Sequence, residues 1–74
     1  MRNAIKSIED VKIGEVYFVS VGRNFEYWDV TDVIGDRVYA DVLEIDENDE
    51  LRATGEVIDC PFKTFNKYYK EAAR

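Results

Sequence analysis

The chain has 74 residues and a net charge of −6 at pH 7, with one cysteine and no histidine. A chain of this length forms a single domain and buries only about 60% of its unfolded surface, so most large apolar side chains are needed for the core. A single cysteine excludes an intramolecular disulfide. The absence of histidine removes the most common general base and metal ligand.

The N-terminal sequence MRNAIKSIEDVK lacks the apolar segment of a secretory signal. No apolar run in the chain approaches the ~18 residues that are needed to cross a bilayer. Together with the unpaired cysteine, these features predict a reducing, cytoplasmic location and no membrane partner.

Charge is distributed unevenly along the chain. Residues 1–61 carry six basic and fifteen acidic side chains, whereas residues 62–74 carry four basic side chains and one acidic side chain. An acidic body repels nucleic acid at long range and favours solubility. We therefore expect any contact with nucleic acid to involve the C-terminal residues.

The first half of the chain predicts a short lead-in followed by two strands. Residues 1–13 form the lead-in, with one helical turn where Ser7 stands three residues before Asp10 as in a helix cap. A first strand is expected over residues 15–21, which are rich in β-branched and aromatic side chains. The turn-forming sequence GRN then leads to a second strand over residues 25–34.

The sequence IGDR at residues 34–37 predicts a tight hairpin, because a two-residue loop with glycine first suits a type II′ turn. This turn pairs Val33 with Val38 and Asp32 with Tyr39. In the strand that follows, every second residue then points to the core: Val38, Ala40 and Val42.

The second strand does not alternate regularly. Trp28 and Val30 share one side-chain parity, while Val33 has the other. A β-bulge near residues 31–32 would bring all three to the core. Depending on how this conflict is resolved, either Phe25 and Tyr27 or Trp28 is left partly exposed.

A polar loop and a further strand follow the hairpin. The loop DENDE at residues 46–50 resembles the start of a calcium-binding loop, but glycine and glutamate are missing from its two most informative positions, so we expect an ordinary hairpin loop. The strand is predicted over residues 51–58, with Leu51, Ala53 and Val57 pointing inward and Gly55 marking a bend.

The C-terminal sequence predicts an amphipathic helix over residues 61–73. Phe62, Phe65 and Tyr69 are spaced to form one apolar face, which we expect to cover the open end of the sheet. The basic side chains form a separate stripe on the helix, made of Lys63, Lys67, Lys70 and Arg74.

The order of these elements resembles that of SH3-like small barrels. The resemblance lies in VKIGEVYFV, where a glycine begins the first strand, and in the tight-turned hairpin VTDVIGDRVYADV, and it covers residues 11–58. It implies a mainly β (α+β) fold, with a strongly bent antiparallel barrel of about four to five strands over residues 14–58, closed by the C-terminal helix. Similar small acidic β-proteins are frequent among phage-encoded accessory proteins.

No residue pattern indicates catalysis. Neither serine has an activating partner in the sequence, and Cys60 would need a lowered pKa to act as a nucleophile, which the adjacent Asp59 opposes. Carboxylates are numerous, but acid–base catalysis requires one of them to lie in an apolar pocket. We therefore expect a non-enzymatic protein without a cofactor or metal.

The preferred function is protein binding. An aromatic strip flanked by carboxylates on one sheet face suits a partner with a basic surface, through cation–π contacts and charge complementarity. The residues that would form this surface are Phe25, Tyr27, Asp29, Asp32, Tyr39 and Asp41. The alternative is that the core and the helix use all of these aromatic side chains.

Two other functions are compatible with the sequence. The protein would bind nucleic acid weakly if Lys63, Lys67, Lys70 and Arg74 contacted phosphates. It would instead mimic nucleic acid, and inhibit an enzyme that binds it, if its carboxylates lay on one side. The carboxylates concerned are those at positions 29, 32, 36, 41, 44, 46, 47, 49 and 50.

Overall fold

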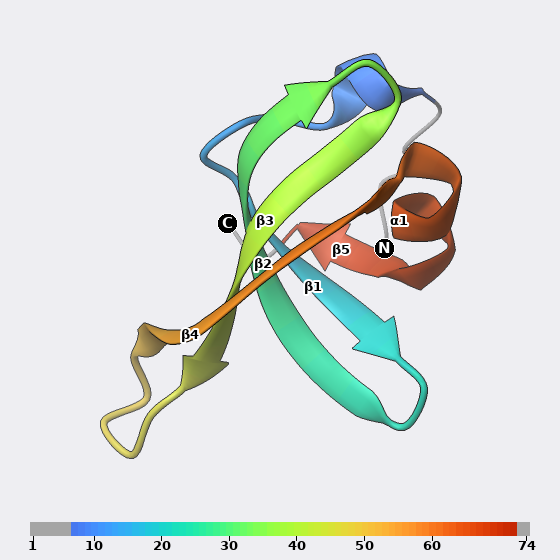
Figure 1. Ribbon diagram of the computed structural model, residues 1–74. Helices are drawn as coiled ribbons and strands as arrows, with labels where there is room; N and C mark the ends of the chain where they lie inside the picture. The colour runs from blue at the N-terminus through green and yellow to red at the C-terminus, as the bar shows by residue number, and fades with distance from the viewer. Residues whose placement is uncertain (1–6, 73–74) are drawn as a thin grey trace.

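The computed structural model describes residues 7–72, with side chains up to residue 68. Its elements are η1 (Ile8–Asp10), β1 (Val16–Val21), β2 (Asn24–Ile34), β3 (Arg37–Ile45), β4 (Leu51–Pro61), α1 (Phe62–Tyr68) and β5 (Tyr69–Ala72). The strands form one antiparallel sheet in the order β4-β3-β2-β1-β5 (Figure 1). The predicted bent antiparallel sheet with a C-terminal helix is confirmed. Within residues 7–72 β4 does not pair with β5, so the sheet is not closed into a barrel.

The β2–β3 hairpin has the predicted register. Gly35 has a φ of 61°, the left-handed conformation that glycine adopts without a steric penalty. Val33 lies opposite Val38, and Asp32 lies opposite Tyr39. The Gly-Asp turn therefore determines which side chains of β3 reach the core.

The predicted β-bulge in β2 is also present. The β2–β3 register shifts between Val30 and Asp32, so no residue of β3 lies directly opposite Thr31. Trp28 and Val30 are buried, and Val33 packs against the same core. The extra residue thus lets side chains of both parities face inward.

The core lies on the inner face of the bent sheet, beneath α1. Its buried members are Val11, Tyr17, Val19, Trp28, Val30, Val38, Ala40, Val42 and Phe65. Phe65 is fully buried and lies edge-on to Tyr17, with ring centroids 5.3 Å apart. The polar atoms of two core aromatic side chains have hydrogen-bond partners. The N–H of Lys12 donates to the Tyr17 hydroxyl at 3.0 Å, and Trp28 Nε1 donates to Glu26 Oε1 at 2.9 Å.

The predicted inward side of β4 was wrong. Leu51, Ala53 and Val57 pair with residues on the outer side of β3, and Val57 is 71% exposed. Ile58 and Cys60 face the core instead, because they lie opposite Ala40 and Val38. The pairing with β3 therefore determines which side of β4 faces the core, although the opposite side carries more apolar side chains.

The predicted helix over residues 61–73 was too long. The helix α1 ends at Tyr68, and Tyr69–Ala72 form β5, which pairs with the edge of β1. Pairing of this edge satisfies backbone groups that a longer helix would leave to solvent. Phe62 and Phe65 pack on the core as predicted, and Tyr68 adds an edge-on contact with Trp28, at 6.3 Å between ring centroids. The side chain of Tyr69 lies outside the described residues.

No helix within residues 7–72 is both long enough and apolar enough to cross a bilayer.

Candidate protein-binding surface

The outer face of the sheet, opposite the core, carries two rows of side chains. The strand register places Phe18, Tyr27 and Leu43 side by side across β1, β2 and β3. The next row contains Asp29 and Asp41 as direct partners. Rows on one face of a sheet are about 6.8 Å apart, since they are separated by two residues along each strand. An apolar row therefore lies next to an acidic one.

All six residues predicted to bind a partner lie on this outer face. Trp28 is buried, so the parity conflict in β2 is resolved with Phe25 and Tyr27 outside. The other predicted residues have intermediate or full exposure: Asp29, Asp32, Tyr39 and Asp41. The structure thus places these six residues on one face of the sheet.

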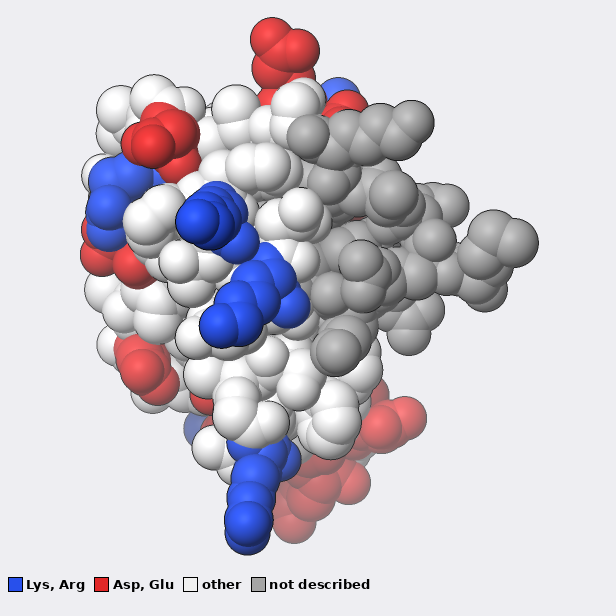
Figure 2. All heavy atoms as spheres, turned by 90° about the vertical axis from the view of Figure 1, so that its right-hand side faces the viewer, with Lys and Arg blue, Asp and Glu red and all other residues white. Residues whose placement is uncertain are grey.

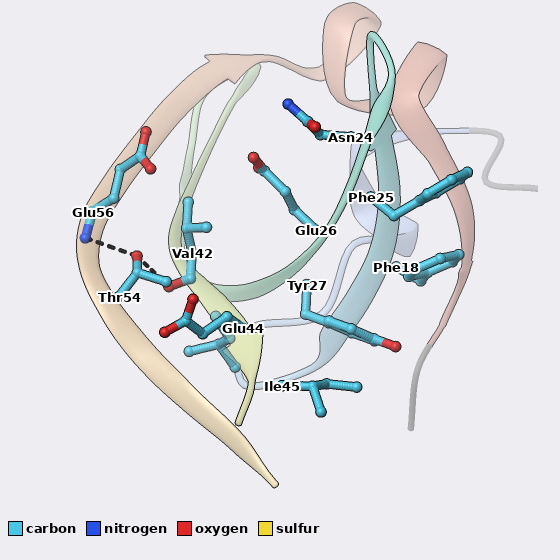
Figure 3. A pocket seen from close by; sticks show the side chains of 11 residues that line it. Phe18, Asn24, Phe25, Glu26, Tyr27, Val42, Glu44, Ile45, Thr54 and Glu56 are labelled. Carbon is cyan, nitrogen blue, oxygen red and sulfur yellow. Dashed lines mark hydrogen bonds between the residues drawn. The ribbon is translucent and has the colours of Figure 1, made fainter. Parts of the chain in front are cut away.

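The aromatic side chains of this face form a cluster of Phe18, Phe25 and Tyr27. Phe18 and Phe25 are stacked, with ring centroids 5.4 Å apart and planes at 10°, and Phe18 lies 5.2 Å from Tyr27 (Figure 3). Phe25 is 64% exposed. Sequence reasoning missed Phe18, although its parity is opposite to that of the buried Tyr17 and Val19. The aromatic cluster presents ring surfaces to solvent that contribute little to the core.

The acidic row carries an unfavourable arrangement. Asp29 and Asp41 are direct cross-strand partners, and like charges in such positions destabilise a sheet. The ion pairs present among the described residues are Arg37–Asp59 and Arg52–Glu44, so neither involves this acidic pair. A cation supplied by a partner would relieve the repulsion between the two aspartates.

The end of the outer face near the β2–β3 turn is electrostatically satisfied. Arg37 Nη2 lies 2.7 Å from Asp59 Oδ2, and Arg37 Nε donates to the same oxygen at 3.1 Å. Asp32 accepts a hydrogen bond from the N–H of Val33 at 2.9 Å. Among the described residues, Asp29 and Asp41 are therefore the aspartates of this face that have neither an ion pair nor a side-chain hydrogen bond.

A cleft opens at the other end of the sheet, between the β1–β2 and β3–β4 hairpins. The β2–β3 pairing stops at Tyr27 and Leu43, and the two hairpins then diverge (Figure 1). The hollow has a volume of about 480 Å³. It is lined by Phe18, Asn24, Phe25, Glu26, Tyr27, Val42, Leu43, Glu44, Ile45, Thr54 and Glu56 (Figure 3). Ligand sites in proteins are typically about 300–1,000 Å³.

The predicted basic stripe is not a single helical face. Lys63 and Lys67 are exposed on α1, whereas Lys70 lies on β5 and Arg74 lies outside the described residues. Viewed from the α1 side, basic side chains occur in small separate groups among uncharged atoms (Figure 2). Only the part of the stripe formed by Lys63 and Lys67 is therefore observed as predicted.

The carboxylates that would mimic phosphates are spread over the molecule. Asp36 lies in the β2–β3 turn, and residues 46–50 lie in the β3–β4 loop at the opposite end of β3. The Asp46 carboxylate accepts hydrogen bonds from the N–H groups of Asn48 and Glu50 at 2.8 and 3.0 Å. The Asp46 carboxylate thus stabilises its own loop. Within residues 7–72 there is no group of three or more acidic, cysteine or histidine side chains that could hold a metal ion.

Cys60 is half-buried at the end of β4. Burial raises the pKa of its thiol, an effect that the nearby Arg37 opposes and Asp59 reinforces. The neutral thiol is therefore favoured at neutral pH, and a neutral thiol is a poor nucleophile.

Comparisons of the chain with models of known protein families, with curated proteins and with solved structures found no match.

Proposed function

We propose that this protein is a non-catalytic protein-binding module that docks through its outer sheet face on the basic surface of another protein. One observation supports this function. The aromatic cluster of Phe18, Phe25 and Tyr27 lies one row from Asp29 and Asp41, which face each other without a basic partner among the described residues. An exposed apolar patch next to unbalanced charge is a feature of interaction sites.

The two rows suit a lysine or arginine side chain. Its aliphatic part would cover Tyr27 or Phe18, and its cationic group would reach the acidic row about 6.8 Å away. A second basic side chain, with its cation over one of the aromatic rings, gains about 0.5–1 kcal/mol at an exposed site. Neutralisation of the repelling Asp29–Asp41 pair adds to this gain.

The biological role in this proposal is that of an accessory or inhibitory factor, encoded by a phage and acting in the cytoplasm. This part rests on the resemblance to SH3-like small barrels and small acidic phage proteins, and not on the geometry of the outer face. SH3-like domains often bind peptides through an exposed aromatic strip, which is an analogy at the level of the fold.

The two alternative functions have less support. A nucleic-acid mimic needs its carboxylates on one side, but Asp36 and the 46–50 loop lie at opposite ends of β3. Nucleic-acid binding would use Lys63, Lys67, Lys70 and Arg74, and four phosphate contacts on an otherwise acidic chain give only weak, salt-sensitive binding. Both alternatives are outcomes of the following experiment.

The proposal is tested by affinity capture from cell lysate with three baits: the wild type, Phe25→Ser, and the double variant Asp29→Asn/Asp41→Asn. Proteins that the wild type retains and both variants lose are then purified and titrated individually. We expect each variant to weaken binding about tenfold or more, since aromatic and charged residues at the centre of an interface dominate its energy. Circular dichroism verifies that the variants remain folded.

The matched control is Lys63→Gln/Lys67→Gln, which removes two charges from α1. We expect this control to bind the partner as tightly as the wild type does. Full binding by Phe25→Ser and by the aspartate variant, with loss in the lysine control, would contradict the proposal and favour the basic residues of α1. Capture of a nucleic-acid enzyme that depends on Glu47 and Asp49 in the loop would favour the mimic.

A further inference from the structure

The cleft between the two hairpins exposes the backbone of strands that pair elsewhere. Residues 24–26 of β2 and residues 44–45 of β3 have no partner across the cleft within the described part of the chain, because the β2–β3 ladder ends at Tyr27 and Leu43. Backbone N–H and C=O groups along such an edge are available to another extended chain. The sheet is thus split between two of its central strands.

Both edges of the cleft are held in an extended conformation, because each strand pairs with its other neighbour in the sheet. In β2, Phe25 pairs with Ser20 of β1, and in β3 Glu44 and Ile45 pair with Arg52 and Leu51 of β4. A strand that enters the cleft would therefore meet edges that are already arranged to receive it. Such preorganisation lowers the conformational cost of binding.

The outer edge of β4 is less suitable for strand addition. The β3–β4 register shifts opposite Val42, where Thr54 to Glu56 form a bulge and Gly55 has a φ of 91°. The Thr54 hydroxyl donates to the Val42 carbonyl at 3.0 Å, and Pro61 ends the strand. Bulges and proline are two of the devices by which sheet edges avoid pairing with other chains. The split between β2 and β3 has neither.

The two sides of the cleft differ in chemistry. On the inner side lie the carboxylates of Glu26, Glu44 and Glu56, and Glu26 is oriented by its hydrogen bond from Trp28. On the outer side lie the aromatic cluster and Ile45 (Figure 3). One of these carboxylates has a basic neighbour, since Arg52 Nε lies 3.9 Å from Glu44 Oε2. This contact is exposed and long, and it leaves the inner side with a net negative charge.

We propose that the cleft binds an extended segment of the partner, in which basic and apolar side chains alternate, as an added strand between β2 and β3. Side chains of a strand alternate between its two faces, so the basic ones would meet the glutamates and the apolar ones would meet Phe25 and Ile45. This inference rests on the proposed protein-binding function, and it specifies the chemistry of the partner.

The test uses the full chain and a synthetic peptide, acetyl-Val-Lys-Val-Lys-Val-Lys-Val-amide, followed by backbone amide NMR. We expect shifts concentrated at residues 24–27 and 43–45. Two control peptides have related chemistry: one has the same composition in blocks of Val and Lys, and the other carries N-methyl groups on its central residues. We expect each to bind about tenfold more weakly, because the first loses the alternation and the second loses donors to the sheet edge.

A pair of protein variants of equal charge isolates the glutamates. Glu44→Gln/Glu56→Gln removes two carboxylates from the cleft, and Glu47→Gln/Asp49→Asn removes two from the β3–β4 loop. We expect the first to weaken the alternating peptide about tenfold and the second to change its binding less than twofold. Equal losses in both variants would show attraction by net charge alone and would overturn the inference.

Other outcomes are also decisive. Absence of shifts along the cleft, or equal binding of the alternating, block and N-methylated peptides, would contradict strand addition. The proposed function would stand in that case, provided that the captured partner still depends on Phe25 and the acidic pair. If the peptides bind in the cleft but the partner ignores the outer face, strand addition is supported and docking through the acidic row fails.

Discussion

The two ends of the sheet are formed by the same two central strands, yet one end is closed and the other is open. Beneath α1, β2 and β3 remain paired as far as their turn, and Phe65 fills the space above them. At the other end the strands separate after Tyr27 and Leu43, and a cleft of about 480 Å³ remains. The difference arises in the side chains on the inner face.

The inner face changes from apolar to acidic along each strand. In β2 the inward positions pass from Val30 and Trp28 to Glu26, and in β3 they pass from Val42 to Glu44. Burial of an unpaired carboxylate is costly, so these positions cannot be covered by a second layer. A chain of 74 residues thus closes its core at one end and places its remaining aromatic side chains on the outer face at the other.

The largest effect is expected at the closed end. Phe65→Ala should lower the free energy of unfolding by about 3–5 kcal/mol, because the side chain is fully buried and its loss leaves a cavity. Chemical denaturation followed by tryptophan fluorescence measures the change. A midpoint equal to that of the wild type would mean that α1 is not part of the cooperative core.

An intermediate effect is expected where the closed end meets the cleft. Trp28→Phe should cost about 1–3 kcal/mol, since it removes buried surface and the hydrogen bond to Glu26. Glu26→Gln is the matched control, because the amide oxygen still accepts from Trp28 Nε1. Thermal denaturation should show a clear loss for the first variant and a small one for the second; similar losses would indicate that the carboxylate charge itself is important for stability.

Sequence reasoning predicted the features that depend on local rules. The glycine turn at Gly35, the register from Val33 to Val38 and the bulge at Thr31 all follow from turn geometry and alternation, and all are observed. The sequence left open whether Phe25 and Tyr27 or Trp28 is turned outward, and the structure, in which Trp28 is buried, places Phe25 and Tyr27 on the outer face.

Features that depend on distant pairing were not predicted. The sequence prediction placed Leu51, Ala53 and Val57 on the inward side of β4, whereas the pairing of Ile58 with Ala40 turns the opposite side of the strand toward the core. The regular spacing of lysines predicts a helix that continues beyond Tyr68. In the structure the following residues instead form β5, which pairs with the edge of β1. One feature of the sequence does indicate the cleft: Glu26 has the same parity as the buried Trp28, so β2 carries a carboxylate on its core side where the cleft opens.

A small stabilisation is expected from the acidic row. Asp41→Asn should raise the free energy of unfolding by about 0.2–1 kcal/mol at neutral pH and low salt, because it removes a like charge opposite Asp29. The gain should shrink as salt screens the repulsion. Asp49→Asn in the loop is the control for net charge, and an equal gain there would show that the cross-strand pair is not special.

The smallest effect on stability is expected at Phe25, although this residue belongs to the proposed binding surface. Phe25→Ala should change the free energy of unfolding by no more than about 0.5 kcal/mol, since the ring is 64% exposed and its stacking contact with Phe18 lies on the surface. The same substitution at Phe65 removes a ring of equal size from the core, so the two variants form a matched pair measured under identical denaturation conditions. A loss at Phe25 that approached the loss at Phe65 would mean that the aromatic cluster is a second core required for folding. A negligible loss would show that folding does not depend on this exposed ring, as the proposed role of Phe25 in binding requires.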